Sequence, residues 1–115
     1  MLVDGDVTIR VGSGGRIRWI VVGKDGETPI DLTTVEEAIL RLDDKESGAS
    51  KTFSTLDAIQ KLVIVEPRSV NIGQIDFYPE GSDFDEESAY DLYIDLMTTP
   101  VPGGKNYTFR VIAAI

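Results

Sequence analysis

The 115-residue sequence contains neither cysteine nor histidine. Without cysteine, the chain has no disulfide, no thiolate nucleophile and no thiolate-bound zinc. Without histidine, it has no His-based catalytic triad, no imidazole metal ligand and no side chain that ordinarily titrates near neutral pH. Basic residues are also few, 11 against 20 acidic ones, which gives a formal net charge of −9. This charge opposes binding to nucleic acid or to an anionic membrane surface, so neither partner is expected.

Long hydrophobic runs are missing as well. The longest, such as Trp19–Val22, are too short to span a bilayer. The first eleven residues hold two aspartates and lack the basic and apolar regions of a secretion signal, so we expect the chain to be made in the cytoplasm. A hydrophobic content of 42% is nevertheless typical of globular proteins. We expect one domain over residues 1–115, with one modest core.

Apolar and polar residues alternate with a period of two in several short runs, which predicts β-strands. Two of these runs, Val7–Val11 and Arg16–Val22, flank the glycine-rich segment Gly12–Gly15, and this arrangement predicts a hairpin. Trp19 falls on the apolar face of the second run and is expected in the core. Roughly six or seven strands with frequent turn signals are typical of a β-sandwich or barrel; the later ones are predicted at residues 62–65, 74–78, 90–96 and 107–113.

Residues 33–42 fit two structures. Thr33 and Glu36 match a capping box at the start of a helix. Ala38, Leu40 and Leu42 also alternate as in a strand. We expect a strand, because an all-β context commonly overrides local propensity. Residues 54–59 are compatible with one helical turn.

Two groups of carboxylates are candidates for metal or catalytic chemistry. Residues 83–87 offer Asp83, Asp85 and Glu87 at alternating positions, and Ca²⁺ prefers such oxygen ligands. The segment lacks the glycine and the spacing of an EF-hand, so a solvated acidic turn is expected. Asp91 and Asp95 share the polar face of strand 90–96, but nothing there predicts a cleft or a raised pKa. We therefore predict no catalytic residue, no metal ligand and no cofactor.

Two further features suggest contacts with other proteins. Tyr93 lies between Asp91 and Asp95 on the polar face, where an exposed aromatic side chain is a candidate contact residue. Charge is distributed unevenly, because residues 1–68 hold 9 basic and 12 acidic side chains whereas residues 69–115 hold 2 and 8. Arg10, Arg16 and Arg18 are close together in the sequence. Separated charges of this kind suggest a head-to-tail contact between copies of the chain.

Several short motifs occur in an order that resembles the immunoglobulin-like N-terminal domain of phage baseplate upper proteins. They are Lys24-Asp25-Gly26, Pro29-Ile30-Asp31-Leu32-Thr33, Val70-Asn71-Ile72-Gly73-Gln74-Ile75, Tyr90-Asp91-Leu92-Tyr93-Ile94 and Tyr107-Thr108-Phe109. The resemblance covers most of residues 7–113. The chain departs from the family pattern at Glu86–Ala89, where family members usually carry a glycine, and those members are often longer.

The resemblance implies an antiparallel immunoglobulin-like β-sandwich of about seven strands. It also implies a non-enzymatic structural component of a phage or prophage particle, of the tail or baseplate type. Such a protein is made in the host cytoplasm and is located in the virion, where its partners are other virion proteins and further copies of itself. The candidate contact residues are Tyr93, Asp91, Asp95, Asp83, Asp85 and Glu87. Two alternatives stay open: a calcium-dependent adhesion or carbohydrate-binding β-sandwich module, and a small glycan-active enzyme.

Overall fold

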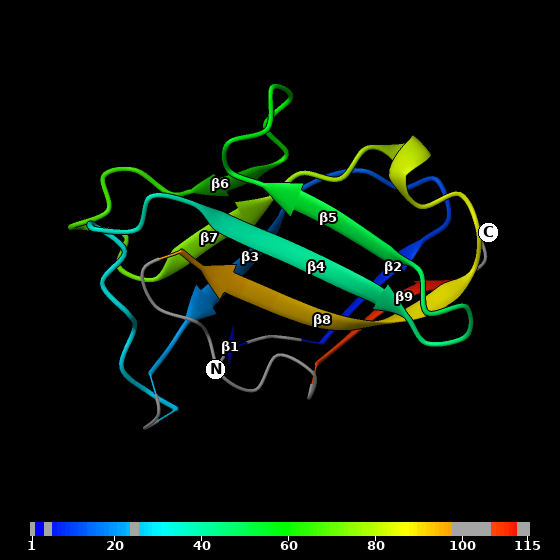
Figure 1. Ribbon diagram of the computed structural model, residues 1–115, viewed down its shortest axis with the longest axis horizontal. Helices are drawn as coiled ribbons and strands as arrows, with labels where there is room; N and C mark the ends of the chain where they lie inside the picture. The colour runs from blue at the N-terminus through cyan, green and yellow to red at the C-terminus, as the bar shows by residue number, and fades with distance from the viewer. Residues whose placement is uncertain (1, 4–5, 24–25, 98–106, 113–115) are drawn as a thin grey trace.

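The computed structural model describes residues 2–3, 6–23, 26–97 and 107–112. Within these residues the chain is all-β and forms two sheets that pack face to face as a sandwich (Figure 1). Nine strands and one short 3₁₀ helix, η1 (Gly81–Asp83), make up this described part. The described residues contain no helix long and apolar enough to cross a membrane.

The two sheets have four and five strands. The first has the order β1-β3-β7-β6 and consists of β1 (Leu2–Val3), β3 (Ile17–Val21), β7 (Gln74–Phe77) and β6 (Leu62–Ile64). The second has the order β2-β9-β8-β4-β5 and consists of β2 (Val7–Arg10), β9 (Tyr107–Ile112), β8 (Ser88–Leu96), β4 (Ala38–Asp44) and β5 (Ser50–Ser54). Neighbouring strands are antiparallel, except that β2 runs parallel to β9.

The predicted hairpin between the first two strands is wrong. β2 pairs with β9 in the second sheet, whereas β3 pairs with β1 and β7 in the first sheet. The glycine-rich segment between them therefore carries the chain from one sheet to the other. A turn begins this crossing, where the Ser13 N–H donates to the Arg10 carbonyl at 3.0 Å, and the Gly12 N–H donates to the Phe84 carbonyl at 3.0 Å.

The strand expected at residues 33–42 is confirmed for residues 38–42, which belong to β4, and is wrong for residues 33–37, which form neither strand nor helix. The strands predicted at 62–65, 74–78 and 90–96 are confirmed as β6, β7 and β8. The last predicted strand is confirmed as β9, and its residue 113 lies outside the described residues. The segment after β5 forms a turn closed by the Asp57 N–H on the Ser54 carbonyl at 3.2 Å, and not a helical turn.

The core lies between the sheets and is rich in aromatic rings. Trp19 is completely buried, as predicted. Phe84 and Phe109 lie with their ring centroids 4.8 Å apart, and the same distance separates Phe53 and Phe77. Each such pair contributes roughly 0.5–1.5 kcal/mol beyond the burial of its surface. Phe84 follows η1 directly, so these contacts fix the acidic segment 83–87 to the core.

Candidate functional site

Tyr93 lies on the outer face of the second sheet, in the centre of β8. Its neighbour in register on β4 is Arg41, whose guanidinium carbon lies 4.2 Å from the centroid of the tyrosine ring. The Arg41 Nε atom is also 3.3 Å from a carboxylate oxygen of Asp43. Tyr93 is half-buried by this arrangement rather than exposed. The cation–π contact holds the two side chains together on the sheet face.

Asp91 and Asp95 lie on either side of Tyr93 on the same face of β8. The Lys45 Nζ atom is 3.5 Å from the Asp91 Oδ1 atom. Asp91 is also the register neighbour of Asp43 on β4. Asp95 faces Ile39 in that register. The two carboxylates of β8 therefore do not converge on one point, and Tyr93 separates them.

The acidic segment 83–87 divides into two parts. The Asp83 carboxylate accepts bonds from the Lys61 ammonium at 2.8 and 2.9 Å and from the Glu80 N–H at 2.8 Å. The bond to Asp83 raises the pKa of Lys61. Asp85 and Glu87 are exposed, as a solvated turn requires. The expected solvated turn is thus confirmed for these two residues and wrong for Asp83, which holds η1 against the segment before β6.

A cleft of about 370 Å³ is lined by this segment and by the β4–β5 turn. Both segments lie at the right in Figure 1. Ser88 donates to Asp44 at 2.7 Å, and this bond lowers the pKa of the carboxyl. Burial raises the pKa of Tyr90 in the cleft wall. The cleft is acidic, since its charged lining residues are Asp44, Glu46, Lys51, Asp83, Asp85, Glu86 and Glu87. No group of three or more Asp or Glu side chains in the described ranges is arranged to hold a metal ion.

An ion pair between exposed Arg18 and buried Asp76 occupies the outer side of the first sheet. Asp76 is 3% exposed and accepts two bonds from Arg18, at 2.6 Å to Nε and 2.8 Å to Nη2. The Tyr78 hydroxyl lies 3.3 Å from the same carboxylate. The Arg18 guanidinium holds the pKa of Asp76 below its usual range. Arg18 thus neutralises an acid of its own chain. Arg10, which the sequence places near Arg18, lies on β2 in the other sheet.

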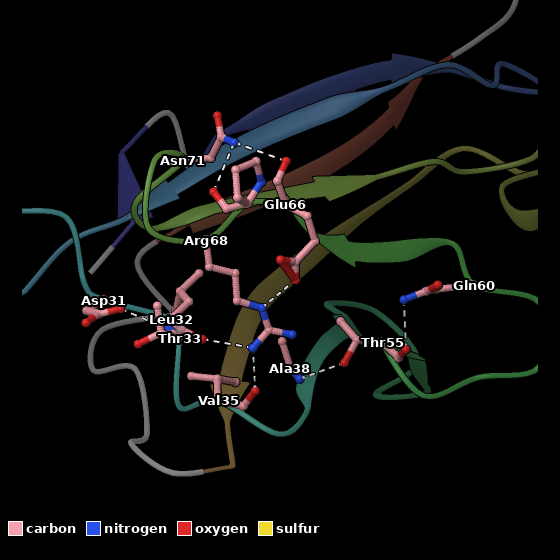
Figure 2. A network of polar contacts seen from close by, with 11 residues as sticks. Asp31, Leu32, Thr33, Val35, Ala38, Thr55, Gln60, Glu66, Arg68 and Asn71 are labelled. Carbon is pink, nitrogen blue, oxygen red and sulfur yellow. Dashed lines mark hydrogen bonds and ion pairs between the residues drawn. The ribbon is translucent and has the colours of Figure 1, made fainter.

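Three loops carry the polar contacts drawn in Figure 2, and two of them, residues 29–37 and 66–73, are joined by Arg68. Its Nη1 atom donates to the carbonyls of Leu32 at 2.9 Å and Val35 at 2.7 Å. Its Nε atom donates to the Glu66 carboxylate at 2.8 Å. The Thr55 side chain accepts a bond from the Ala38 N–H at 3.0 Å. We name residues 29–37, 54–60 and 66–73 the loop platform.

The loop platform could not be found from the sequence. Arg68 binds backbone carbonyls, which every residue carries, so no pair of side-chain types marks the contact. Asp83 and Lys61 are likewise 22 residues apart, and nothing in their spacing predicts their ion pair. Asp31 gave a weak local signal, since its carboxylate accepts the Thr33 N–H at 2.9 Å in an Asx turn.

Comparison with known proteins finds no family model, no curated protein and no solved structure that matches this chain. Any assignment of function therefore depends on the strand order, the surfaces described above and the motif resemblance.

Proposed function

We propose that this chain is an immunoglobulin-like β-sandwich and a non-enzymatic assembly component of a phage or prophage particle, of the tail or baseplate type. It acts through contacts with other particle proteins. The motif resemblance over residues 7–113 suggests this class of protein, and the order of the strands supports it.

The strand order is the observation that carries the proposal. Immunoglobulin-like domains place strands A, B, E and D in one sheet and C, F and G in the other, and variable-type domains add a strand C′ beside C. If β1 and β2 are two halves of strand A, the first sheet has the order A-B-E-D. The second sheet then has the order A′-G-F-C-C′, with A′ parallel to G. Such sandwiches serve many functions, so the choice among them depends on the surfaces.

The placement of the carboxylates favours binding over catalysis. A glycosidase needs two carboxylates that flank one bond and have separated pKa values. Here Asp76 is neutralised by Arg18 and Asp83 by Lys61, while Tyr93 separates Asp91 from Asp95. These contacts give the acids structural or surface roles.

The outer face of β4 and β8 has the composition of a protein contact. Tyrosine and arginine are enriched among the residues that dominate binding energy, and here Tyr93 and Arg41 stack at the centre of the face. Asp91 and Asp95 surround them as a polar rim. Because the stack is already ordered by the cation–π contact, little side-chain entropy is lost when a partner covers it.

Mass spectrometry of gradient-purified particles released from the source cells tests this proposal. We expect the chain in the particle fraction at a constant ratio to the other structural proteins. The variant Tyr93→Ala should be incorporated about tenfold less than wild type and should fold normally, because Tyr93 lies outside the core. Tyr78→Ala removes an exposed tyrosine that directly follows β7 and is the matched control. A chain that stays entirely in the soluble fraction contradicts the particle role, and equal incorporation of both variants contradicts the role of the β4–β8 face.

A further inference from the structure

Exposed hydrophobic side chains are concentrated around the loop platform. Seven large ones are exposed among the residues that the structure describes. Leu56, Ile59, Val70 and Ile72 belong to the platform, with Leu56 68%, Ile59 72% and Val70 74% exposed. A fifth, Met97, is attached to it, since its N–H donates to the Glu37 carbonyl at 2.9 Å. Single exposed hydrophobic residues are normal, but here two occur on each of two loops, and both loops are bonded to the short segment 35–38, one through Arg68 and the other through Thr55.

The loop that carries Leu56 and Ile59 is held by its own polar groups. The Ser54 N–H donates to the Asp57 carboxylate at 2.9 Å, and the Leu56 N–H donates to the Ser54 hydroxyl at 3.1 Å. The Gln60 amide donates to the Thr55 carbonyl at 2.9 Å. The polar side chains thus bond the backbone of their own loop, and Leu56 and Ile59 are exposed to the solvent. A loop ordered in advance loses little entropy when it binds.

The other apolar loop is fixed just as firmly. Arg68 ties it to the carbonyls of Leu32 and Val35, as Figure 2 shows. At its far end Gly73 has a φ of +74°, and a Cβ atom there would lie 2.7 Å from the Val21 carbonyl oxygen. Only glycine fits this close approach, which holds the loop against β3. Val70 and Ile72 are therefore presented on a rigid support.

The charge of the platform identifies the kind of partner. Its three segments contain five acidic residues and one basic residue, a net charge of −4. The single basic residue, Arg68, is already engaged in three hydrogen bonds. A second copy of the chain would bring the same negative charge to the contact, and this repulsion disfavours self-association there. A partner with an apolar recess bordered by lysine or arginine has the complementary chemistry.

We propose that the loop platform docks a second protein through apolar recesses bordered by basic residues, with Leu56 and Ile59 entering from one loop and Val70 and Ile72 from the other. The β4–β5 turn and the segment 83–87, which line the acidic cleft, lie at the right in Figure 1, whereas loops 29–37 and 66–73 lie at the left. The cleft attracts basic groups by charge alone. Docking at the platform differs because it requires apolar contact as well. This proposal stands independently of the particle role, since it depends only on the platform's exposed side chains and charge.

An NMR titration of the ¹⁵N-labelled full chain tests the proposal with two probes. One is a short amphipathic peptide of leucine and lysine, and the other is a matched peptide in which glycine replaces leucine. We expect the leucine–lysine peptide to shift amides in residues 29–37, 54–60 and 66–73. The glycine–lysine peptide should leave these amides unchanged and shift only those near the acidic cleft. A leucine–lysine peptide that shifts only the cleft amides, or none, overturns the proposal.

Variants and a dilution series complete the test. Leu56→Ser and Val70→Ser should each weaken binding of the leucine–lysine peptide about tenfold, and both should fold because the side chains are exposed. Ile112→Ser changes an exposed side chain on β9, outside the platform, and should bind like wild type. Equal affinity of all three variants overturns the proposal. Platform amides that shift with protein concentration alone identify a second copy as the occupant and also overturn it.

Discussion

Arg68 gives the sharpest test of how the loop platform is held. Arg68→Met keeps the aliphatic stem but removes both hydrogen bonds to the carbonyls of Leu32 and Val35. A bond from a charged donor contributes roughly 1.5–3 kcal/mol, and the two part-buried carbonyls would be left without their donor. The ion pair with the mostly exposed Glu66 adds at most about 1 kcal/mol. We expect the free energy of unfolding to fall by about 3 kcal/mol.

Such a loss is large for a domain of this size, whose total stability is roughly 5–15 kcal/mol. It corresponds to a decrease in Tm of roughly 10–15 °C. Urea unfolding followed by Trp19 fluorescence measures the change, since Trp19 is the single tryptophan and is buried in the core. Glu66→Gln removes only the ion pair and should stay within about 1 kcal/mol of wild type. If Arg68→Met unfolds within about 0.5 kcal/mol of wild type, water replaces the guanidinium and the platform does not depend on Arg68.

Two other perturbations test the Arg18–Asp76 ion pair and the anchor of the acidic segment. Arg18 lowers the pKa of Asp76 in the folded protein. The stability that the Asp76 carboxylate contributes is therefore fully present above its pKa in the unfolded chain, about 3.9. It is lost as the pH falls through the lower pKa of the folded protein. Asp76→Asn should therefore lower the free energy of unfolding by about 2 kcal/mol at neutral pH. The variant should also lose less stability than wild type as the pH falls below about 4. The same dependence of stability on acid pH in both proteins would contradict this. Phe84→Ala should lower the free energy of unfolding by about 3–5 kcal/mol, because Phe84 is buried in the core. The control Glu87→Gln, at an exposed side chain, should lower it by less than about 0.5 kcal/mol. Equal melting curves for the two variants would show that Phe84 is not a core residue.

The strands were predictable where one face of a sheet is buried and the other is solvated. In β8, Tyr90, Leu92, Ile94 and Leu96 point into the core, and the alternation of the sequence reports this directly. β5 carries the same signal only weakly, because Phe53 is its single buried residue and the strand lies at a sheet edge. The sequence pattern therefore did not predict β5, because an edge strand with one buried residue shows little alternation.

Strand partners could not be predicted in the same way. The alternation of Val7 and Ile9 is identical whether β2 pairs with the next strand or with β9, which lies about 100 residues further along the chain. A glycine-rich segment favours a hairpin, but it serves a crossing between sheets equally well. The burial of Phe84 could not be predicted from its neighbours either. An aromatic residue among acidic ones gives no local sign that it is anchored in the core.

The distribution of basic side chains bears on the head-to-tail contact predicted from the sequence. Such a contact needs a basic surface to meet the acidic cleft. Within the described residues, five of the basic side chains lie within 4 Å of a carboxylate of the same chain: Arg18, Arg41, Lys45, Lys61 and Arg68. Lys51 lies in the wall of the acidic cleft itself. Five of the nine basic side chains in the described ranges are thus paired within the fold, whereas Asp85, Glu86 and Glu87 of the cleft are exposed. A partner that supplies its own basic groups satisfies both surfaces better than a second copy does, and the dilution series decides between them.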